Sequence, residues 1–291
     1  ENTAVGSKAG TAVTTGTANT LIGKDSGLTL TTGDNNTVIG AKAADAMTTS
    51  NDNVAIGLNS IGQATTQTDR VVSIGSGAMG GGIGTADITG LVAIGYEALA
   101  GSLEATTDFT VAIGYQALKV LTSGGKNTAI GYQAGLETTI GDFNTYIGYQ
   151  SGYRTANLNN QHNTFVGYNA GSGDWTSTLS SKNTAIGSNA MIGAMNSSLQ
   201  NSAMGYAALS ALTTGNNNIG IGVTAGDVIT TGGSNTIIGS ESDPSANSAT
   251  NQTVVGYAVT GVANNSVTLG NASTTAVYMA QDSGATVHAG K

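Results

Sequence analysis

The chain of 291 residues contains no cysteine, one proline, few aromatic residues (5%) and few charged residues (9%). Without cysteine it can form no disulfide framework, no thiolate metal site and no cysteine nucleophile. No apolar run approaches the ~20 residues of a transmembrane helix, so we expect no membrane span in this chain. The net charge of −8, with no cluster of Lys or Arg, argues against binding to nucleic acid.

Glycine, by contrast, is abundant, with 44 residues, and Thr and Asn are frequent beside it. This composition disfavours helices, because glycine costs about 1 kcal/mol relative to alanine in a helix interior and strong helix formers do not occur in runs. Disorder is also disfavoured, since 39% of the residues are hydrophobic and the excess of acidic residues is spread along the chain. We therefore expect a folded protein without helices.

A short unit, seen intact as Asn-Thr-Ala-Ile-Gly at 127–131 and 183–187, recurs along the chain. Its closing glycine, here called the anchor, is spaced by 17 to 20 residues until the last interval, which is 14. The sixteen anchors are Gly6, Gly23, Gly40, Gly57, Gly75, Gly95, Gly114, Gly131, Gly148, Gly167, Gly187, Gly205, Gly222, Gly239, Gly256 and Gly270. A period of this length is typical of a solenoid, in which each repeat buries its apolar face against its neighbours.

Residues around each anchor alternate in kind, which is the pattern of a β-strand. The second half of each unit carries turn residues, as in Thr-Thr-Gly-Asp-Asn-Asn at 31–36. Seventeen residues have room for two short strands and two turns but not for a helix and a strand. We therefore predict an all-β parallel β-solenoid of about sixteen coils, roughly 70 Å long at ~4.8 Å per coil. Residues 1–262 form the repeat domain, and residues 263–291 form a short last coil and a C-terminal segment.

Two positions of the unit predict stacked ladders along this rod. The aliphatic residue before each anchor is expected to form an internal ladder. Its central members are Ile94, Ile113, Ile130 and Ile147. The asparagine at the head of the unit is expected to bond to the coils on either side through its amide. Its central members are Asn127, Asn144, Asn163 and Asn183. The Ala or Ser three places after the anchor forms a small-residue stripe, either inside one roll or between rolls.

The unit Asn-(Thr/Ser/Val)-Ala-Ile-Gly resembles the head repeats of trimeric autotransporter adhesins, which fold as a YadA-like left-handed β-roll. This resemblance covers essentially the whole chain. It implies a parallel homotrimer on a bacterial cell surface, used for attachment. The repeats of that family are nearer fourteen residues, so extra residues in each coil are expected to form loops.

The longer unit Asn-Thr-Ala-Ile-Gly-Tyr-Gln-Ala-Gly at 127–135 is more similar to repeats of phage tail-fibre proteins. The segment 265–280 resembles the stretch before an endosialidase-type intramolecular chaperone, which trimerises such fibres and then cleaves itself off. This second resemblance implies a virion tail fibre that binds a host cell-surface carbohydrate or protein receptor. On this basis we expect an extracellular, non-enzymatic fragment or processed product, with the adhesin as the alternative.

Tyrosine follows the anchor in five consecutive units, at Tyr96, Tyr115, Tyr132, Tyr149 and Tyr168, and again at Tyr206 and Tyr257. A stacked aromatic row stabilises a solenoid, and an exposed one also suits contact with sugars. Long units cluster at 57–114 and 148–205, and insertions in a solenoid map to one face, often the binding face. The second cluster predicts a glycan site. Its candidate residues are Tyr153, Arg154, His162, Asp174 and Trp175. The alternative is that these residues bind no ligand and only cover one edge of the solenoid.

No catalytic constellation, metal site or cofactor is expected. The two histidines, His162 and His288, are far apart in the sequence, and the acidic groups at Asp45 and Asp52 or around Glu97 lack the spacing of a catalytic pair. A further alternative is ice binding by Thr-rich turns, such as Thr31-Thr32 and Thr213-Thr214.

Overall fold

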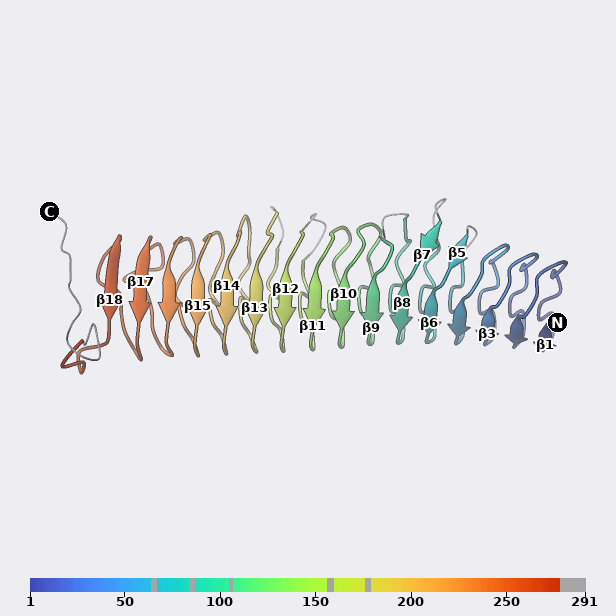
Figure 1. Cartoon of the computed structure of the whole chain (residues 1–291), viewed down its shortest axis with the longest axis horizontal. Coiled ribbons are helices and arrows are strands. Elements are labelled where there is room, and N and C mark those ends of the chain that lie inside the picture. Colours follow the sequence, from blue (N-terminus) through green and yellow to red (C-terminus); the bar gives the residue numbers. More distant parts are fainter. Residues whose placement is uncertain (64–66, 84–86, 105–106, 156–159, 176–178, 278–291) are drawn as a thin grey trace, which may run out of the picture.

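The computed structural model describes residues 1–63, 67–83, 87–104, 107–155, 160–175 and 179–277. Sixteen short strands form one parallel sheet, stacked in chain order along the length of a rod (Figure 1). The described residues contain no helix. The predicted all-β parallel solenoid is therefore confirmed, and its strands follow the sixteen-unit repeat.

Each anchor glycine directly follows a strand of the main sheet. These strands are β1 (Thr3–Val5), β2 (Thr20–Ile22), β3 (Thr37–Ile39), β4 (Val54–Ile56), β6 (Val72–Ile74), β8 (Val92–Ile94), β9 (Val111–Ile113), β10 (Thr128–Ile130), β11 (Thr145–Ile147), β12 (Thr164–Val166), β13 (Thr184–Ile186), β14 (Ser202–Met204), β15 (Ile219–Ile221), β16 (Thr236–Ile238), β17 (Gln252–Val255) and β18 (Ser266–Leu269).

The expected second strand of each coil is reduced to fragments. One two-stranded sheet pairs β5 (Thr68–Asp69) with β7 (Ile88–Thr89), and the other turn halves, as far as the structure describes them, contain only isolated bridges such as Ser123 with Ile140. The prediction of two strands in each coil is therefore wrong for most coils. The turn half of the unit is held to its neighbours mainly by single backbone hydrogen bonds, for example from the Leu118 amide to the Ala134 carbonyl at 3.0 Å.

The aliphatic ladder forms in perfect register, but it lies on the outside of the roll. Ile94 pairs with Ile113, Ile113 with Ile130 and Ile130 with Ile147. The side chain that points inward is the middle residue of each strand, such as the fully buried Ala129, whereas Ile130 is 38% exposed. The prediction of an internal Ile ladder is therefore wrong.

The interior of the roll is narrow, and side chains from the strand and from the turn half share it. The turn half of the unit already sends large side chains into it, for example Leu118 and Leu121, which are both fully buried. The inward strand position varies in size to fill what remains of this close-packed core, with alanine at Ala112 and Ala129 and an aromatic ring at Tyr146 and Phe165 in the next two coils. The small-residue stripe also faces the interior. Its buried members include Ala43, Ala78, Ala117, Ala134, Ser151 and Ala225.

The asparagines form the expected column inside the roll. Where two Asn are neighbours in the column, the backbone amide of one donates to the side-chain oxygen of the Asn one coil earlier, at 2.9 Å from Asn144 to Asn127 and at 3.0 Å from Asn163 to Asn144. The Asn144 side-chain amide donates onward to the Asn160 carbonyl at 2.8 Å. The column therefore satisfies polar groups that would otherwise be buried without partners.

The anchor glycines meet two requirements that only glycine satisfies. Gly131 has a φ of +142°, where L side chains are rarely found, and a Cβ atom on it would lie against the carbonyl oxygen of Gly148. Two places later the chain enters the left-handed region, at Gln133 with a φ of +53°. At this left-handed residue the chain bends out of the sheet and enters the turn half of the unit.

Candidate functional site

The tyrosines that follow the anchors form one continuous stack. Neighbouring ring centroids are 4.9–5.3 Å apart and the ring planes differ by 8–17°. The five members are Tyr96, Tyr115, Tyr132, Tyr149 and Tyr168. Each is 41–52% exposed, yet its neighbours cover the faces of the inner rings. The row therefore offers ring edges and hydroxyl groups to a ligand, and not the flat ring faces on which a sugar stacks.

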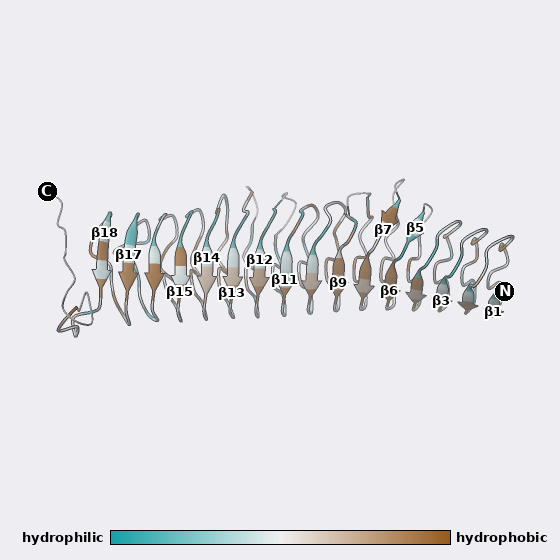
Figure 2. Cartoon of the chain, in the orientation of Figure 1, coloured by the Kyte–Doolittle hydropathy of each residue, from teal (hydrophilic) through white to brown (hydrophobic). Residues whose placement is uncertain are grey.

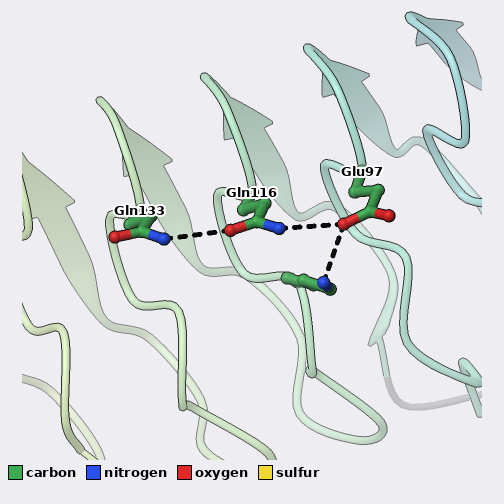
Figure 3. A network of polar contacts seen from close by, with 4 residues as sticks. Glu97, Gln116 and Gln133 are labelled. Carbon is green, nitrogen blue, oxygen red and sulfur yellow. Dashed lines mark hydrogen bonds and ion pairs between the residues drawn. The ribbon is translucent and has the colours of Figure 1, made fainter.

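A row of amides runs beside the tyrosines, two places after each anchor. Gln116 Nε2 donates to Glu97 Oε2, and Gln133 Nε2 donates to Gln116 Oε1, both at 2.9 Å (Figure 3). Gln150 Nε2 donates in turn to Gln133 Oε1 at 2.9 Å. Glu97, Gln116, Gln133 and Gln150 are here called the amide row.

The amide row begins at a charged pair. Lys119 Nζ lies 2.7 Å from Glu97 Oε2. The hydrogen bond from Lys119, followed by the one from Gln116, lowers the pKa of the Glu97 carboxyl below its ordinary value. The row therefore starts at an ionised carboxylate, and every side-chain amide along it donates toward that charge.

A hollow of about 510 Å³ opens beside the last member of the amide row. Its polar lining includes Gln150, Tyr153, Arg154, Asn169 and Asp174, and Ile192 adds an apolar wall. These residues come from the turn halves of three successive coils, the ones that follow Gly148, Gly167 and Gly187. The structure thus brings together three of the five predicted site residues, Tyr153, Arg154 and Asp174.

Arg154 and Asp174 form an ion pair at the rim of this hollow. Arg154 Nη1 lies 2.6 Å from Asp174 Oδ1, and the guanidinium carbon is 5.8 Å from the centroid of the Tyr153 ring. The hydrogen bond to Asp174 raises the pKa of the Arg154 guanidinium further. Both side chains are about half exposed, so the pair contributes little to stability and leaves charged atoms facing the hollow.

Trp175 does not belong to this surface. Its side chain is fully buried, and its ring meets Phe165 edge-on, with centroids 5.5 Å apart at 83°. The hypothesis that Trp175 offers a platform for sugar stacking is therefore wrong. The long coil folds this large aromatic side chain into the core, where its burial stabilises the roll by the hydrophobic effect.

His162 lies in a separate hollow of about 290 Å³, which shares no lining residue with the first. Its ring stacks on Phe143 with centroids 4.9 Å apart, and Lys126 Nζ lies 5.0 Å from the Phe143 centroid. Lys182 also lines this hollow. The predicted site is therefore divided, because His162 precedes its strand, whereas Tyr153 and Arg154 follow theirs.

The sequence-based prediction missed Gln150 and Asn169. Asn169 Oδ1 is buried and has no hydrogen-bond partner. The signal was present in the repeated Tyr-Gln pairs at 115–116, 132–133 and 149–150, of which only the tyrosines were given a role. A polar residue that recurs at the same position of successive units stacks from coil to coil, just as the tyrosines beside it do.

In the described part of the chain, no three His, Asp or Glu side chains are grouped so that they could hold a metal ion. His288 lies outside the described residues. Among the residues that the structure describes, no helix is long and apolar enough to cross a bilayer. No family model, no curated protein and no solved structure matches this chain.

Proposed function

We propose that this chain is the shaft of a non-enzymatic, extracellular attachment protein that works as a homotrimer, most closely akin to a phage tail fibre. A bacterial surface adhesin is the alternative. The two resemblances of the repeat support this reading, and the exposed face of the main sheet is the observation that carries it. Three rods side by side would present the same binding edges three times.

The outer face of the sheet is an unbroken aliphatic stripe, here called the Ile stripe. It consists of the last residue of every main-sheet strand, with a row of Thr or Val beside it. Many of its members are 36–58% exposed, including Ile130, Ile147, Ile186, Met204, Ile221 and Ile238. Brown segments on successive strands in Figure 2 follow the hydrophobic residues of the sheet along the rod.

The size of this face supports its burial by further copies of the chain. Sixteen strands at ~4.8 Å, each three residues wide at ~3.3 Å per residue, give a face of roughly 700 Å². A trimer divides this face between two neighbouring copies, so each contact is smaller than the ~800 Å² per partner of a standard interface, but the whole face is as large as the biggest patches on ordinary monomers, which often mark interaction sites. The main-sheet strands also carry no charged side chain, as expected of a contact between copies.

The oligomeric state tests this part of the proposal. We expect light scattering to give three times the chain mass of 28.6 kDa. The double variant Ile221→Asp/Ile238→Asp places like charges on the Ile stripe and should shift the protein to monomers. Asn217→Asp/Ser234→Asp adds the same charges to exposed positions in the same two coils and should leave the trimer intact. A wild-type protein that is monomeric at micromolar concentration would refute the proposal.

Attachment is tested by binding of the labelled protein to a panel of bacterial strains. Three linked copies of a weak site gain ~10²-fold or more in avidity over one. The Ile221→Asp/Ile238→Asp variant should therefore bind the recognised strain at least ~10²-fold more weakly, with the Asn217→Asp/Ser234→Asp variant unchanged. Failure to bind any strain, or equal binding by monomer and trimer, would contradict the proposed function.

The ice-binding alternative needs a regular face of Thr side chains. The outer sheet carries Thr in one row, as at Thr128 and Thr145, but Val takes that place at Val92 and Val111, and the second row is aliphatic. We therefore expect no thermal hysteresis from the purified protein.

A further inference from the structure

We propose that the hollow beside Gln150 is a binding subsite for a neutral saccharide, in which the side-chain oxygen of Gln150 accepts a hydrogen bond from a sugar hydroxyl. This inference rests on the proposed attachment function and names the ligand class of its site. It depends on how the amide row ends.

The amide row has a direction. Each glutamine of the row donates a side-chain N–H to the side-chain oxygen one coil earlier, from Gln150 to Gln133, from Gln133 to Gln116 and from Gln116 to the Glu97 carboxylate. The last oxygen, Gln150 Oε1, has no donor within the described protein, because the next coil does not supply one. Since linked hydrogen bonds polarise one another, a terminal acceptor of such a row is a good one.

The amide row ends at the next coil, because the side chain there is one methylene group shorter than glutamine. Asn169 occupies the place where the three coils before it carry Gln, two residues after its anchor, and its backbone is equally left-handed, with a φ of +53°. Its shorter side chain makes no hydrogen bond to Gln150, and its own Oδ1 is buried without a partner. Gln150 Oε1 thus lacks a donor beside the hollow, whereas Asn169 Oδ1 is closed off from solvent and from a ligand.

The remaining lining selects against anions. The charge of Arg154 is neutralised by Asp174, and the second oxygen of that carboxylate adds a further acceptor at the rim. An acidic sugar would bring its carboxylate toward Asp174 and the Gln150 oxygen, and the cation at this rim, Arg154, is already paired with Asp174. A neutral sugar supplies the hydroxyl donor that Gln150 Oε1 lacks, and Ile192, 39% exposed, gives an apolar wall for its C–H groups.

The sharpest test restores the missing methylene group. In Asn169→Gln the longer amide can donate to Gln150 Oε1 and extend the amide row by one step, which occupies the acceptor and fills the hollow. We expect the melting temperature to be retained and saccharide binding to fall by about tenfold or more, as for the loss of the hydrogen bond to Gln150 Oε1. Asn189→Gln, at the same place one coil later and outside the hollow, is the matched control and should bind normally.

The probe is an array of immobilised oligosaccharides, one set built from neutral hexoses and N-acetylhexosamines and the other containing sialic or uronic acids. We expect the wild type to bind members of the neutral set, Asn169→Gln and Gln150→Met to lose this binding, and Asn189→Gln to keep it. Binding confined to the acidic set, no binding to either set, or undiminished binding by Asn169→Gln would each overturn the proposal.

The cell-binding assay separates this inference from the function on which it rests. If Asn169→Gln still binds the strain that the wild type recognises, the subsite is wrong while attachment stands. If the wild type binds no strain, the attachment function itself fails.

Discussion

At the scale of single residues, Asp243 carries the clearest electrostatic cost. Its Oδ1 atom is buried without a hydrogen-bond partner. Burial, with the charge of Asp227 adding to it, raises the pKa of the Asp243 carboxyl to about 6 from an ordinary value of 3.8. Between these two values the folded protein holds a proton that the unfolded chain releases. Stability from this group is therefore present below about pH 4 and is lost as the pH rises through about 6.

Replacing Asp243 by Asn should remove this cost. We expect Asp243→Asn to raise the free energy of unfolding at pH 7 by about 1 kcal/mol, a value reduced for the half-exposed position of the group. At pH 4 the variant should match the wild type. Thermal unfolding measured at both pH values checks this, and a gain of equal size at pH 4 would contradict the electrostatic cause.

Trp175 contributes to the core and not to the binding surface. Trp175→Ala removes a fully buried aromatic side chain, and we expect it to lower the free energy of unfolding by about 3–5 kcal/mol. Trp175→Phe should lower it by less. Because Trp175 is the only tryptophan, its fluorescence should be blue-shifted in the folded protein and should follow unfolding directly. A wild-type emission maximum like that of free tryptophan would contradict its burial.

At the scale of the coil, each anchor glycine is required by its backbone and by its neighbour. Gly131→Ala should destabilise the protein by at least about 2 kcal/mol, because the new Cβ meets the Gly148 carbonyl and the φ of +142° is strained for alanine. Gly77→Asn is the control, since Gly77 has a φ of +67° and a Cβ there meets only a side-chain atom of Glu97 at 3.5 Å. Asn tolerates that φ, so we expect a change within ~0.5 kcal/mol in chemical denaturation. Equal losses in both variants would refute the steric argument.

The features of the coil that repeat along the sequence were predictable, whereas those that depend on how side chains pack in the interior were not. Period and alternation located the strands and the Asn column, because both follow from stacking like residues on like. Alternation alone does not say which set of side chains faces inward. Size suggested Ile130, but the middle residue of each strand faces inward whatever its size, as the fully buried Ala129 and Tyr146 show. The hollow was only partly predictable, because turns of three coils with different lengths form it.

At the scale of the whole molecule, contacts between main-sheet strands join only neighbouring coils, from β1 with β2 to β17 with β18. The stability of such a rod is close to a sum over coils and the interfaces between them. Removing residues 1–34, the first two coils, should therefore leave the remaining coils folded. The calorimetric enthalpy of unfolding should fall roughly in proportion to the length removed. Loss of the β-sheet signal in circular dichroism on this truncation would contradict the additive picture.

The direction of the backbone hydrogen bonds has a mechanical consequence for a rod that is held at one end and pulled at the other. The bonds between β10 and β11, like those of every strand pair, point along the rod, so tension peels coils one at a time and does not shear many bonds together. Each coil of 17 residues that unfolds can lengthen the chain by at most about 60 Å. A tether built in this way would lengthen in steps under load, and the unfolding coils would take up the applied force before the contact at its end breaks.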